Sequence, residues 1–97
     1  MSTLSVIEKW VEVRSKVLDL GCGNGNILSE LQKTRDVIGL GVEIEEKNIE
    51  ECLLQNINVI EQNIDDGLIN FSNDSFDVVI LSQTIQVLKN PNTALGE

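Results

Sequence analysis

Short runs of apolar residues alternate along this chain with longer segments whose apolar positions recur at helical spacing. The short runs lie at residues 17–20, 37–42, 58–61 and 76–81 and predict four strands. Residues 4–13, 24–32 and 45–55 place their apolar side chains on one face of a helix. Strands that alternate with helices in this order are typical of βαβ units and of a parallel sheet.

The last of these runs, residues 76–81, is almost continuously apolar. A strand of this kind is covered on both faces, as in the interior of a parallel sheet. Asn90 followed by Pro91 predicts the cap and first residue of a further helix, of which the chain contains barely two turns. We therefore expect an α/β fold, a parallel sheet with helices on both faces, of which residues 1–97 contain one part of one domain.

Residues 17–25, with the sequence V-L-D-L-G-C-G-N-G, join a predicted strand to a predicted helix through alternate glycines. Glycine adopts backbone conformations that other residues avoid, and it lets a ligand approach the main chain closely. The free N–H groups at the start of the helix favour a negative group in front of them. A carboxylate, such as that of a methionine-type ligand, is therefore the natural guest.

Glu43 lies 18 residues after Gly25, at the end of the second predicted strand. A carboxylate there can accept hydrogen bonds from both hydroxyls of a ribose. A dinucleotide site is the rival interpretation, but its G-x-G-x-x-G pattern requires glycine at position 26, which is Asn26. The spacing therefore argues against NAD and FAD. A tight turn that binds no ligand is the other alternative.

The formal net charge of −9 disfavours nonspecific binding to nucleic acid or to an anionic membrane. The chain contains no histidine, and Cys22 and Cys52 lack metal-ligand spacing, so we expect no metal site. We interpret both cysteines as packing residues and Trp10 as an anchor for the first helix. Neither a signal peptide nor a membrane span is present in the sequence, which favours a cytoplasmic location.

The V-L-D-L-G-C-G-N-G segment resembles motif I of the class I S-adenosylmethionine-dependent methyltransferases. Over about residues 14–97 the chain is similar to the methionine-biosynthesis protein W family of that superfamily, through G-V-E-I at 41–44, N-V-I at 58–60, D-D-G-L at 65–68 and D-S-F-D-V-V-I-L-S-Q-T-I-Q at 74–86. The resemblance implies a Rossmann-like sheet of strand order 3-2-1-4-5-7-6, of which this chain, truncated at its C-terminus, supplies strands 3-2-1-4. Residues 78–81 would then form an exposed apolar edge through which copies could self-associate.

The resemblance also implies that S-adenosylmethionine is the cofactor. Gly21, Gly23 and the backbone near Cys22 would hold its methionine part, and Asp19 would order the loop or reach the ligand's amino group. Glu43 would bind the ribose, and Ile44 would pack on the adenine.

Three further residues complete the implied site. Asn63 and Ile64 follow the third strand, where the superfamily usually has an aspartate that accepts a hydrogen bond from the adenine amino group. Asn63 can still accept that bond, but without charge assistance. Ser82, with Gln83, would face the sulfonium and the substrate. No catalytic residue is identified, since methyl transfer mainly requires alignment of the two reactants.

Three functions are consistent with this sequence. The first is a methyltransferase of unknown acceptor, linked to methionine biosynthesis. The second is a cofactor-binding accessory subunit of a homoserine O-acyltransferase, the partner that the resemblance implies. The third is a nucleotide-binding Rossmann protein of another class, which the position of Gly25 disfavours.

Overall fold

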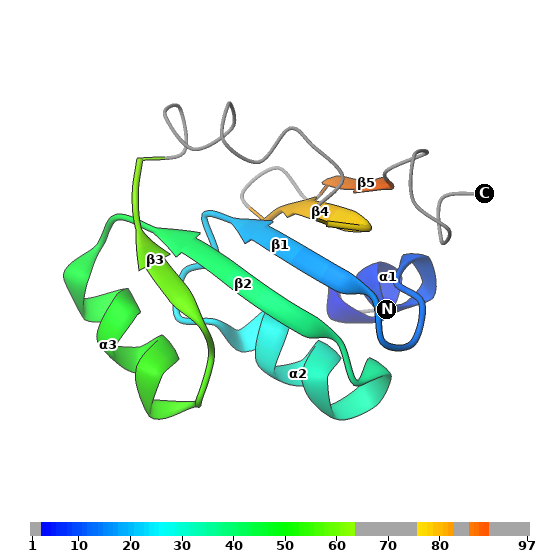
Figure 1. Ribbon diagram of the computed structural model, residues 1–97, viewed down its shortest axis with the longest axis horizontal. Coiled ribbons are helices and arrows are strands. Elements are labelled where there is room, and N and C mark those ends of the chain that lie inside the picture. The colour runs from blue at the N-terminus through cyan, green and yellow to red at the C-terminus, as the bar shows by residue number, and fades with distance from the viewer. Residues whose placement is uncertain (1–2, 64–75, 83–85, 90–97) are drawn as a thin grey trace.

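Helices and strands alternate along the chain in the computed structural model, which describes residues 3–63, 76–82 and 86–89 (Figure 1). The predicted strands and the first three predicted helices are all present, within a few residues of the expected bounds. The helix predicted from Asn90 and Pro91 lies outside the described residues. The elements are α1 (Thr3–Trp10), β1 (Lys16–Leu20), α2 (Asn26–Arg35), β2 (Ile38–Glu43), α3 (Glu46–Leu54), β3 (Val59–Glu61), β4 (Val78–Leu81) and β5 (Gln86–Lys89).

The strands form one sheet in the order β3-β2-β1-β4-β5. β1 lies between β2 and β4 and is parallel to both, and β3 is parallel to β2. This confirms the predicted order 3-2-1-4. From β1 the chain continues to β2 on one flank of β1, and β4 pairs with the opposite flank. The carboxyl end of β1 is therefore a switch point, where ligands of such sheets bind.

β5 is the one strand that the sequence analysis did not predict. It pairs antiparallel with β4, so that Val87 lies opposite Ile80 and Gln86 lies opposite Leu81. The prediction that residues 78–81 form an exposed edge is therefore wrong, and with it the basis for self-association through that edge. The physical reason is proximity along the chain: antiparallel strands can be joined by a short connection, and only four residues separate β4 from β5.

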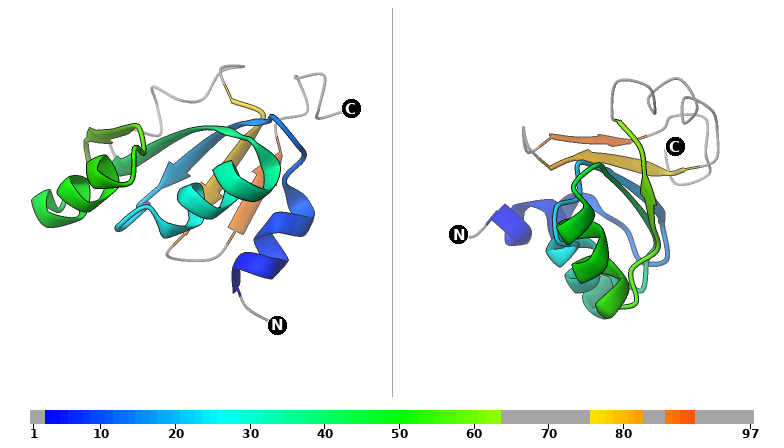
Figure 2. Two further views of the ribbon diagram at one scale, coloured as in Figure 1. Left: turned by 90° about the horizontal axis from the view of Figure 1, so that it is seen from below. Right: turned by 90° about the vertical axis from the view of Figure 1, so that its left-hand side faces the viewer.

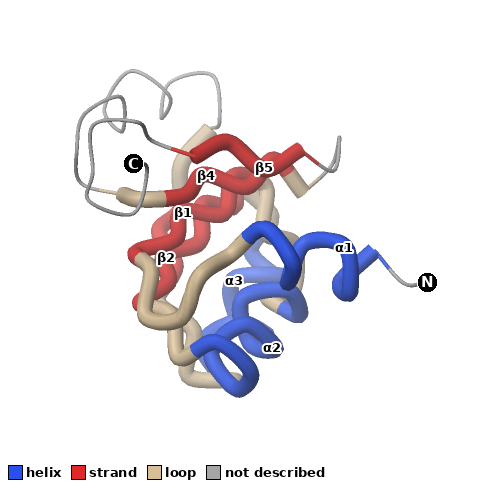
Figure 3. Tube along the Cα trace, turned by 90° about the vertical axis from the view of Figure 1, so that its right-hand side faces the viewer, coloured by secondary structure: helices blue, strands red, loops and turns tan. Residues whose placement is uncertain are grey.

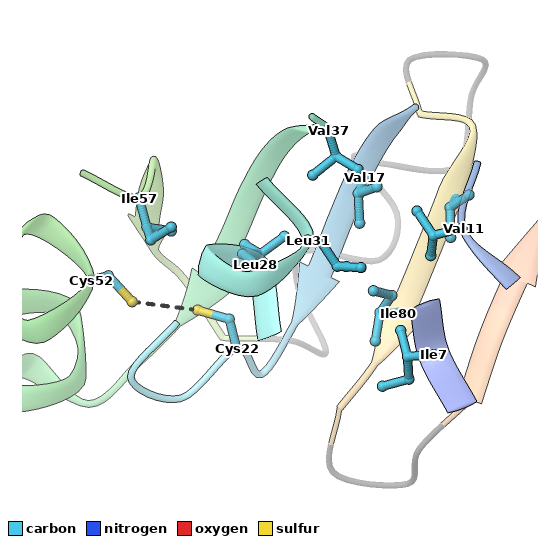
Figure 4. Close-up of a cluster of buried hydrophobic side chains, with 11 residues drawn as sticks. Ile7, Val11, Val17, Cys22, Leu28, Leu31, Val37, Cys52, Ile57 and Ile80 are labelled. Atoms are coloured by element: carbon cyan, nitrogen blue, oxygen red, sulfur yellow. Dashed lines mark hydrogen bonds between the residues drawn. The ribbon is translucent and has the colours of Figure 1, made fainter. Parts of the chain in front are cut away.

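The three helices of the described residues, α1, α2 and α3, lie on the same face of the sheet (Figure 2 and Figure 3). The prediction of helices on both faces is thus confirmed for one face, and no helix covers the other among residues 3–63, 76–82 and 86–89. Beneath the helices lies an aliphatic core, as the near-absence of aromatic residues requires (Figure 4). Its members are Ile7, Val11, Val17, Cys22, Leu28, Leu31, Val37, Cys52, Ile57, Val78 and Ile80.

The opposite face of the sheet is also apolar. Leu18, Leu20 and Val42 are buried there, and partly buried hydrophobic residues of β2, β3 and β4 pack against them. Buried residues on both faces of the sheet agree with the expectation from the almost continuous apolar run at residues 76–81, which predicted a strand covered on both faces.

Trp10 does not anchor α1 in the core as expected, because 56% of its surface is exposed. Ile7 and Val11, one turn apart, are the buried side chains of this segment. Trp10 instead lines a shallow apolar hollow of about 210 Å³ together with Val6, Ile7 and Val87. The aliphatic residues of α1 thus contribute its core contacts, and the indole lies at the rim.

Candidate functional site

The carboxyl ends of β1, β2 and β4 meet at one edge of the sheet, and the glycine-rich loop at residues 21–25 follows β1 at that edge. The loop is fastened to β2, since the N–H groups of Gly21 and Cys22 both donate to the carbonyl of Val42, at 2.9 and 3.1 Å. Gly25 N–H donates to the Cys22 carbonyl at 3.1 Å and closes the turn. The hydrogen bonds to Val42 and the pairing of β1 with β2 thus set the position of the glycine-rich loop.

Gly21, Gly23 and Gly25 all have positive φ, at 70°, 58° and 86°. Side chains rarely tolerate this left-handed region, which explains the alternate glycines. The surroundings of two of these glycines differ. A Cβ atom built on Gly23 would meet no atom within 4 Å, whereas one on Gly25 would lie 3.0 Å from Cys52 Sγ. Gly25 is therefore a packing glycine, whereas the position of a Cβ atom on Gly23 faces open space.

Glu43 ends β2 beside this loop and is only 6% exposed. Its Oε1 accepts a hydrogen bond from Gly23 N–H at 2.9 Å. Its Oε2 accepts bonds from Glu45 N–H at 3.0 Å and from the Asn48 side-chain amide at 3.5 Å. The carboxylate predicted to bind a ribose thus also joins the glycine loop to the start of α3. Since each carboxylate oxygen carries two lone pairs, Oε1 can accept a second donor.

Asp19 lies in β1 and is completely buried. Its Oδ1 accepts a hydrogen bond from the Ser82 hydroxyl, and its Oδ2 has no hydrogen-bond partner in the described part of the chain. Burial raises the pKa of this carboxyl to about 7, the nearby charge of Glu43 acts in the same direction, and the Ser82 hydrogen bond opposes both. A buried carboxylate oxygen without a donor is unfavourable, so this oxygen is a natural acceptor for a cationic ligand group.

Asp19 and Ser82 meet because β1 and β4 are adjacent, with Leu20 opposite Leu81. Both residues are among those that the family resemblance places in the site, but their hydrogen bond was not predicted. The available signal was their position near the carboxyl ends of two strands that the family order makes neighbours.

The remaining predicted residues lie around the same edge or outside the described residues. Ile44 follows Glu43 and is 55% exposed, as an apolar surface for a ring requires. Asn63 is exposed beyond β3, and the neighbouring Gln62 N–H donates to the Glu43 carbonyl at 3.0 Å. Ile64 and Gln83 lie outside the described residues.

Cys22 and Cys52 are buried, as expected of packing residues. What the sequence analysis missed is that they meet: their Sγ atoms lie 3.9 Å apart beneath the glycine loop (Figure 4). Burial is the main cause that raises the pKa of both thiols. Neither thiol is therefore an activated nucleophile.

Three features of the surroundings concern metal ions, membranes and other hollows. No group of three or more His, Cys, Asp or Glu side chains that could hold a metal ion occurs in the described residues. None of the helices described has the length and apolar character needed to cross a membrane. A surface hollow of about 450 Å³ lies beside α2, lined by residues such as Leu4, Ile27 and Lys33, and it contains none of the predicted site residues.

Sequence comparison matches residues 2–97 to the family model described as methionine biosynthesis protein MetW. The chain is also 36% identical over 91 residues to a bifunctional methionine biosynthesis protein MetXA/MetW of Rhodopirellula baltica. That alignment covers 86% of this chain and 15% of the relative. The chain therefore spans a small part of the length of this curated relative.

Two solved structures similar to this chain are S-adenosylmethionine-dependent methyltransferases in complex with S-adenosylhomocysteine. The protein from Geobacter sulfurreducens has a TM-score of 0.66 at 21% identity, over 86% of this chain and 37% of that one. The protein from Thiobacillus denitrificans has a TM-score of 0.65 at 19% identity, again over 86% and 37%. These similarities show that the fold is Rossmann-like, of the kind found in methyltransferases.

Proposed function

Because the chain belongs to the methionine biosynthesis protein MetW family, we propose that it binds S-adenosylmethionine as a methyltransferase-like protein of methionine biosynthesis. As part of the same proposal we place it in the cytoplasm.

The observation that carries the proposal is the arrangement around the Gly23 main chain. A buried carboxylate oxygen without a donor, Asp19 Oδ2, lies near the end of β1. A second carboxylate, that of Glu43, contacts the Gly23 amide from β2. An amino acid joined to a ribose carries a cationic ammonium group and two hydroxyl groups, which are the donors that two such carboxylates accept.

The residues present fit this ligand. Asp19 would accept from the ammonium group, and the ligand's carboxylate would lie in front of the N-terminal end of α2, where the helix dipole favours negative charge. Glu43 would hold the ribose, while Ile44 and Asn63 would contact the adenine. When bound, S-adenosylmethionine supplies a methyl group on a positively charged sulfur.

Asp19 and Glu43 are thus binding residues in this proposal, and the Ser82 hydroxyl orients the Asp19 carboxyl by donating to Oδ1. The negative charge on both carboxylates would favour a cationic sulfonium ligand over its neutral thioether counterpart. Alignment and exclusion of water are the main needs of methyl transfer, so the site requires no histidine or metal.

A second candidate function is supported by the bifunctional relative, in which MetXA and MetW belong to one protein. In that case the chain binds the same ligand but acts as an accessory subunit of a homoserine O-acyltransferase. Co-purification with the acyltransferase, without release of S-adenosylhomocysteine from S-adenosylmethionine, would support this function over methyl transfer.

Calorimetric titration of the chain with S-adenosylmethionine, S-adenosylhomocysteine and NAD tests the proposal. We expect the two adenosyl amino acids to bind and NAD not to bind. Glu43→Ala should weaken binding by more than about tenfold. The exposed Glu50 of α3 provides the matched control, because Glu50→Ala removes the same charge away from the site. A folded chain that binds neither adenosyl compound, or equal affinities in the two variants, would overturn the proposal.

A further inference from the structure

Two thiols that the proposed function does not use lie directly beneath the glycine loop. Cys22 belongs to the loop and Cys52 to α3, 30 residues apart in sequence, yet their Sγ atoms are 3.9 Å apart (Figure 4). Both sulfur atoms also lie within hydrogen-bonding distance of the Gly23 carbonyl oxygen, at 3.6 Å for Cys22 and 3.3 Å for Cys52. The thiol pair therefore contacts Gly23, whose N–H group donates to the Glu43 carboxylate.

The space that the two sulfur atoms occupy exists because two neighbouring residues lack side chains. A Cβ atom on Gly41 of β2 would lie 2.6 Å from Cys22 Sγ. A Cβ atom on Gly25 would lie 3.0 Å from Cys52 Sγ. Glycines thus border the thiol pair on two sides, and backbone from β2 and from the start of α2 encloses it.

We propose that Cys22 and Cys52 form an intramolecular disulfide under oxidation, and that this disulfide weakens ligand binding at the glycine loop. The second half rests on the proposed function, because it needs a ligand at that loop. A disulfide requires the sulfur atoms to approach to about 2.0 Å, so closure shortens their separation by roughly 2 Å.

The step balances with hydrogen peroxide as the oxidant. The Cys22 thiol is 7% exposed where Cys52 is fully buried, and it first loses its proton to hydroxide as the pH is raised. The resulting thiolate attacks one peroxide oxygen and becomes a sulfenic acid, while the other oxygen leaves as hydroxide. Cys52 sulfur then attacks the Cys22 sulfur, the S–S bond forms and water leaves. In total, two thiols and one peroxide give one disulfide and two waters.

Closure would act on the loop through the main chain. Cys22 lies between Gly21 and Gly23, so movement of its side chain toward α3 pulls on both left-handed residues. The disulfide also removes both S–H donors from the Gly23 carbonyl. Because burial raises the pKa of both thiols, oxidation is slow at neutral pH and accelerates as the pH rises.

The test begins with peroxide treatment of the 97-residue chain at pH 8, followed by intact mass measurement without reductant. We expect a loss of two hydrogen atoms, reversed by dithiothreitol. Titration with S-adenosylhomocysteine should then give about tenfold weaker binding for the oxidised chain. Reduction should restore the original affinity.

Cys52→Ser is the control, because it leaves the loop residue Cys22 in place. This variant should show no loss of two hydrogens, and peroxide should leave its affinity unchanged. The proposal is overturned if both wild-type thiols remain alkylatable after treatment and unfolding. It is equally overturned if the disulfide forms and the affinity stays the same.

A readout that needs no ligand separates this proposal from the proposed function. Amide NMR signals of Gly21 and Gly23 should shift when the disulfide forms, since the loop backbone moves. Absence of S-adenosylhomocysteine binding by the reduced chain would refute the proposed function. Unchanged glycine signals in a chain that carries the disulfide would refute the coupling between the sulfur pair and the loop.

Discussion

The main-chain N–H of Gly23 donates to Glu43 Oε1 across 2.9 Å, although 20 residues separate them in sequence. The parallel pairing of β1 with β2 brings the two residues together, since Gly23 lies in the loop that follows β1 and Glu43 is the last residue of β2. Glu43 therefore stabilises the glycine loop, and in the proposed function it also binds the ligand beside that loop. Loss of its carboxylate should therefore affect stability and ligand binding together.

Two substitutions at Glu43 should differ in how much they reduce the stability of the chain and its affinity for the ligand. Glu43→Ala leaves the Gly23 and Glu45 amides without their acceptor, so the free energy of unfolding should fall by about 1–3 kcal/mol. Glu43→Gln keeps one carbonyl acceptor and should lose less. Urea unfolding measures the stability of both variants, and calorimetry with S-adenosylhomocysteine measures their affinity. Wild-type stability in Glu43→Ala would show that these hydrogen bonds are unimportant.

Asp19 should make stability depend on pH. Burial raises its pKa from 3.8 to about 7 in the folded chain, which therefore binds this proton more tightly than the unfolded chain does. The contribution of Asp19 is fully present below pH 3.8 and is lost as the pH rises through about 7. Asp19→Asn keeps the shape of the side chain and removes the charge. We expect this variant to be roughly 1–4 kcal/mol more stable than wild type at pH 8, with a small difference at pH 4.

Ligand binding should respond to Asp19 in the opposite sense. The charged carboxylate is the form that accepts an ammonium group, so wild-type affinity for S-adenosylhomocysteine should increase as the pH rises through about 7. Asp19→Asn should bind more weakly and lose most of this dependence. Titrations at pH 6 and pH 8 measure it, and identical pH profiles for the two proteins would exclude Asp19 as the acceptor.

Gly23→Ala and Gly25→Ala form a matched pair, because both residues have positive φ. The left-handed backbone alone should destabilise each variant by about 1–2 kcal/mol. Gly25→Ala should be destabilised further, since its methyl group lies 3.0 Å from Cys52 Sγ. The methyl group of Gly23→Ala would meet no atom of the chain within 4 Å but would fill the space proposed for the ligand. This variant should therefore be less destabilised than Gly25→Ala, but it should bind the ligand more weakly than wild type. Thermal unfolding and calorimetry on the same samples give both quantities.

Gly41 should be intolerant of alanine for a different reason. Its Cβ atom would lie 2.6 Å from Cys22 Sγ and 3.2 Å from Cys22 Cβ. Gly41→Ala should therefore destabilise the chain by about 1–3 kcal/mol through overpacking. Cys22→Ala removes the sulfur, so adding it to Gly41→Ala should recover part of that loss. A double-mutant cycle measured by urea unfolding checks this, and strictly additive effects would mean that the two residues do not clash.

The positions of the strands and of the glycine loop could be predicted because each depends on a local pattern. Apolar runs of four to six residues and the alternate glycines can be identified directly in the sequence. The strand order 3-2-1-4 was predicted from the family resemblance. Trp10 was misplaced because its size predicts burial, whereas the apolar stripe of the first helix is already completed by Ile7 and Val11.

Features that depend on contacts between distant segments could not be predicted in this way. The Asp19–Ser82 hydrogen bond spans 63 residues and the Cys22–Cys52 contact spans 30. Neither has a spacing signature, because the register of β1 with β4 sets the first distance and the packing of α3 against the glycine loop sets the second. Residues 86–89 were missed for another reason: they are few and mixed in polarity, so their strand structure comes from pairing with β4.

The antiparallel course of β5 has a consequence for how this sheet could be extended. Its backbone occupies the hydrogen-bonding edge that β4 would otherwise offer. A strand from further along a polypeptide, or from another molecule, could reach β4 only after the four-residue hairpin arm detached. A further strand on that side of the sheet must therefore pair with the free edge of β5, or it must displace β5 and pair with β4 in its place.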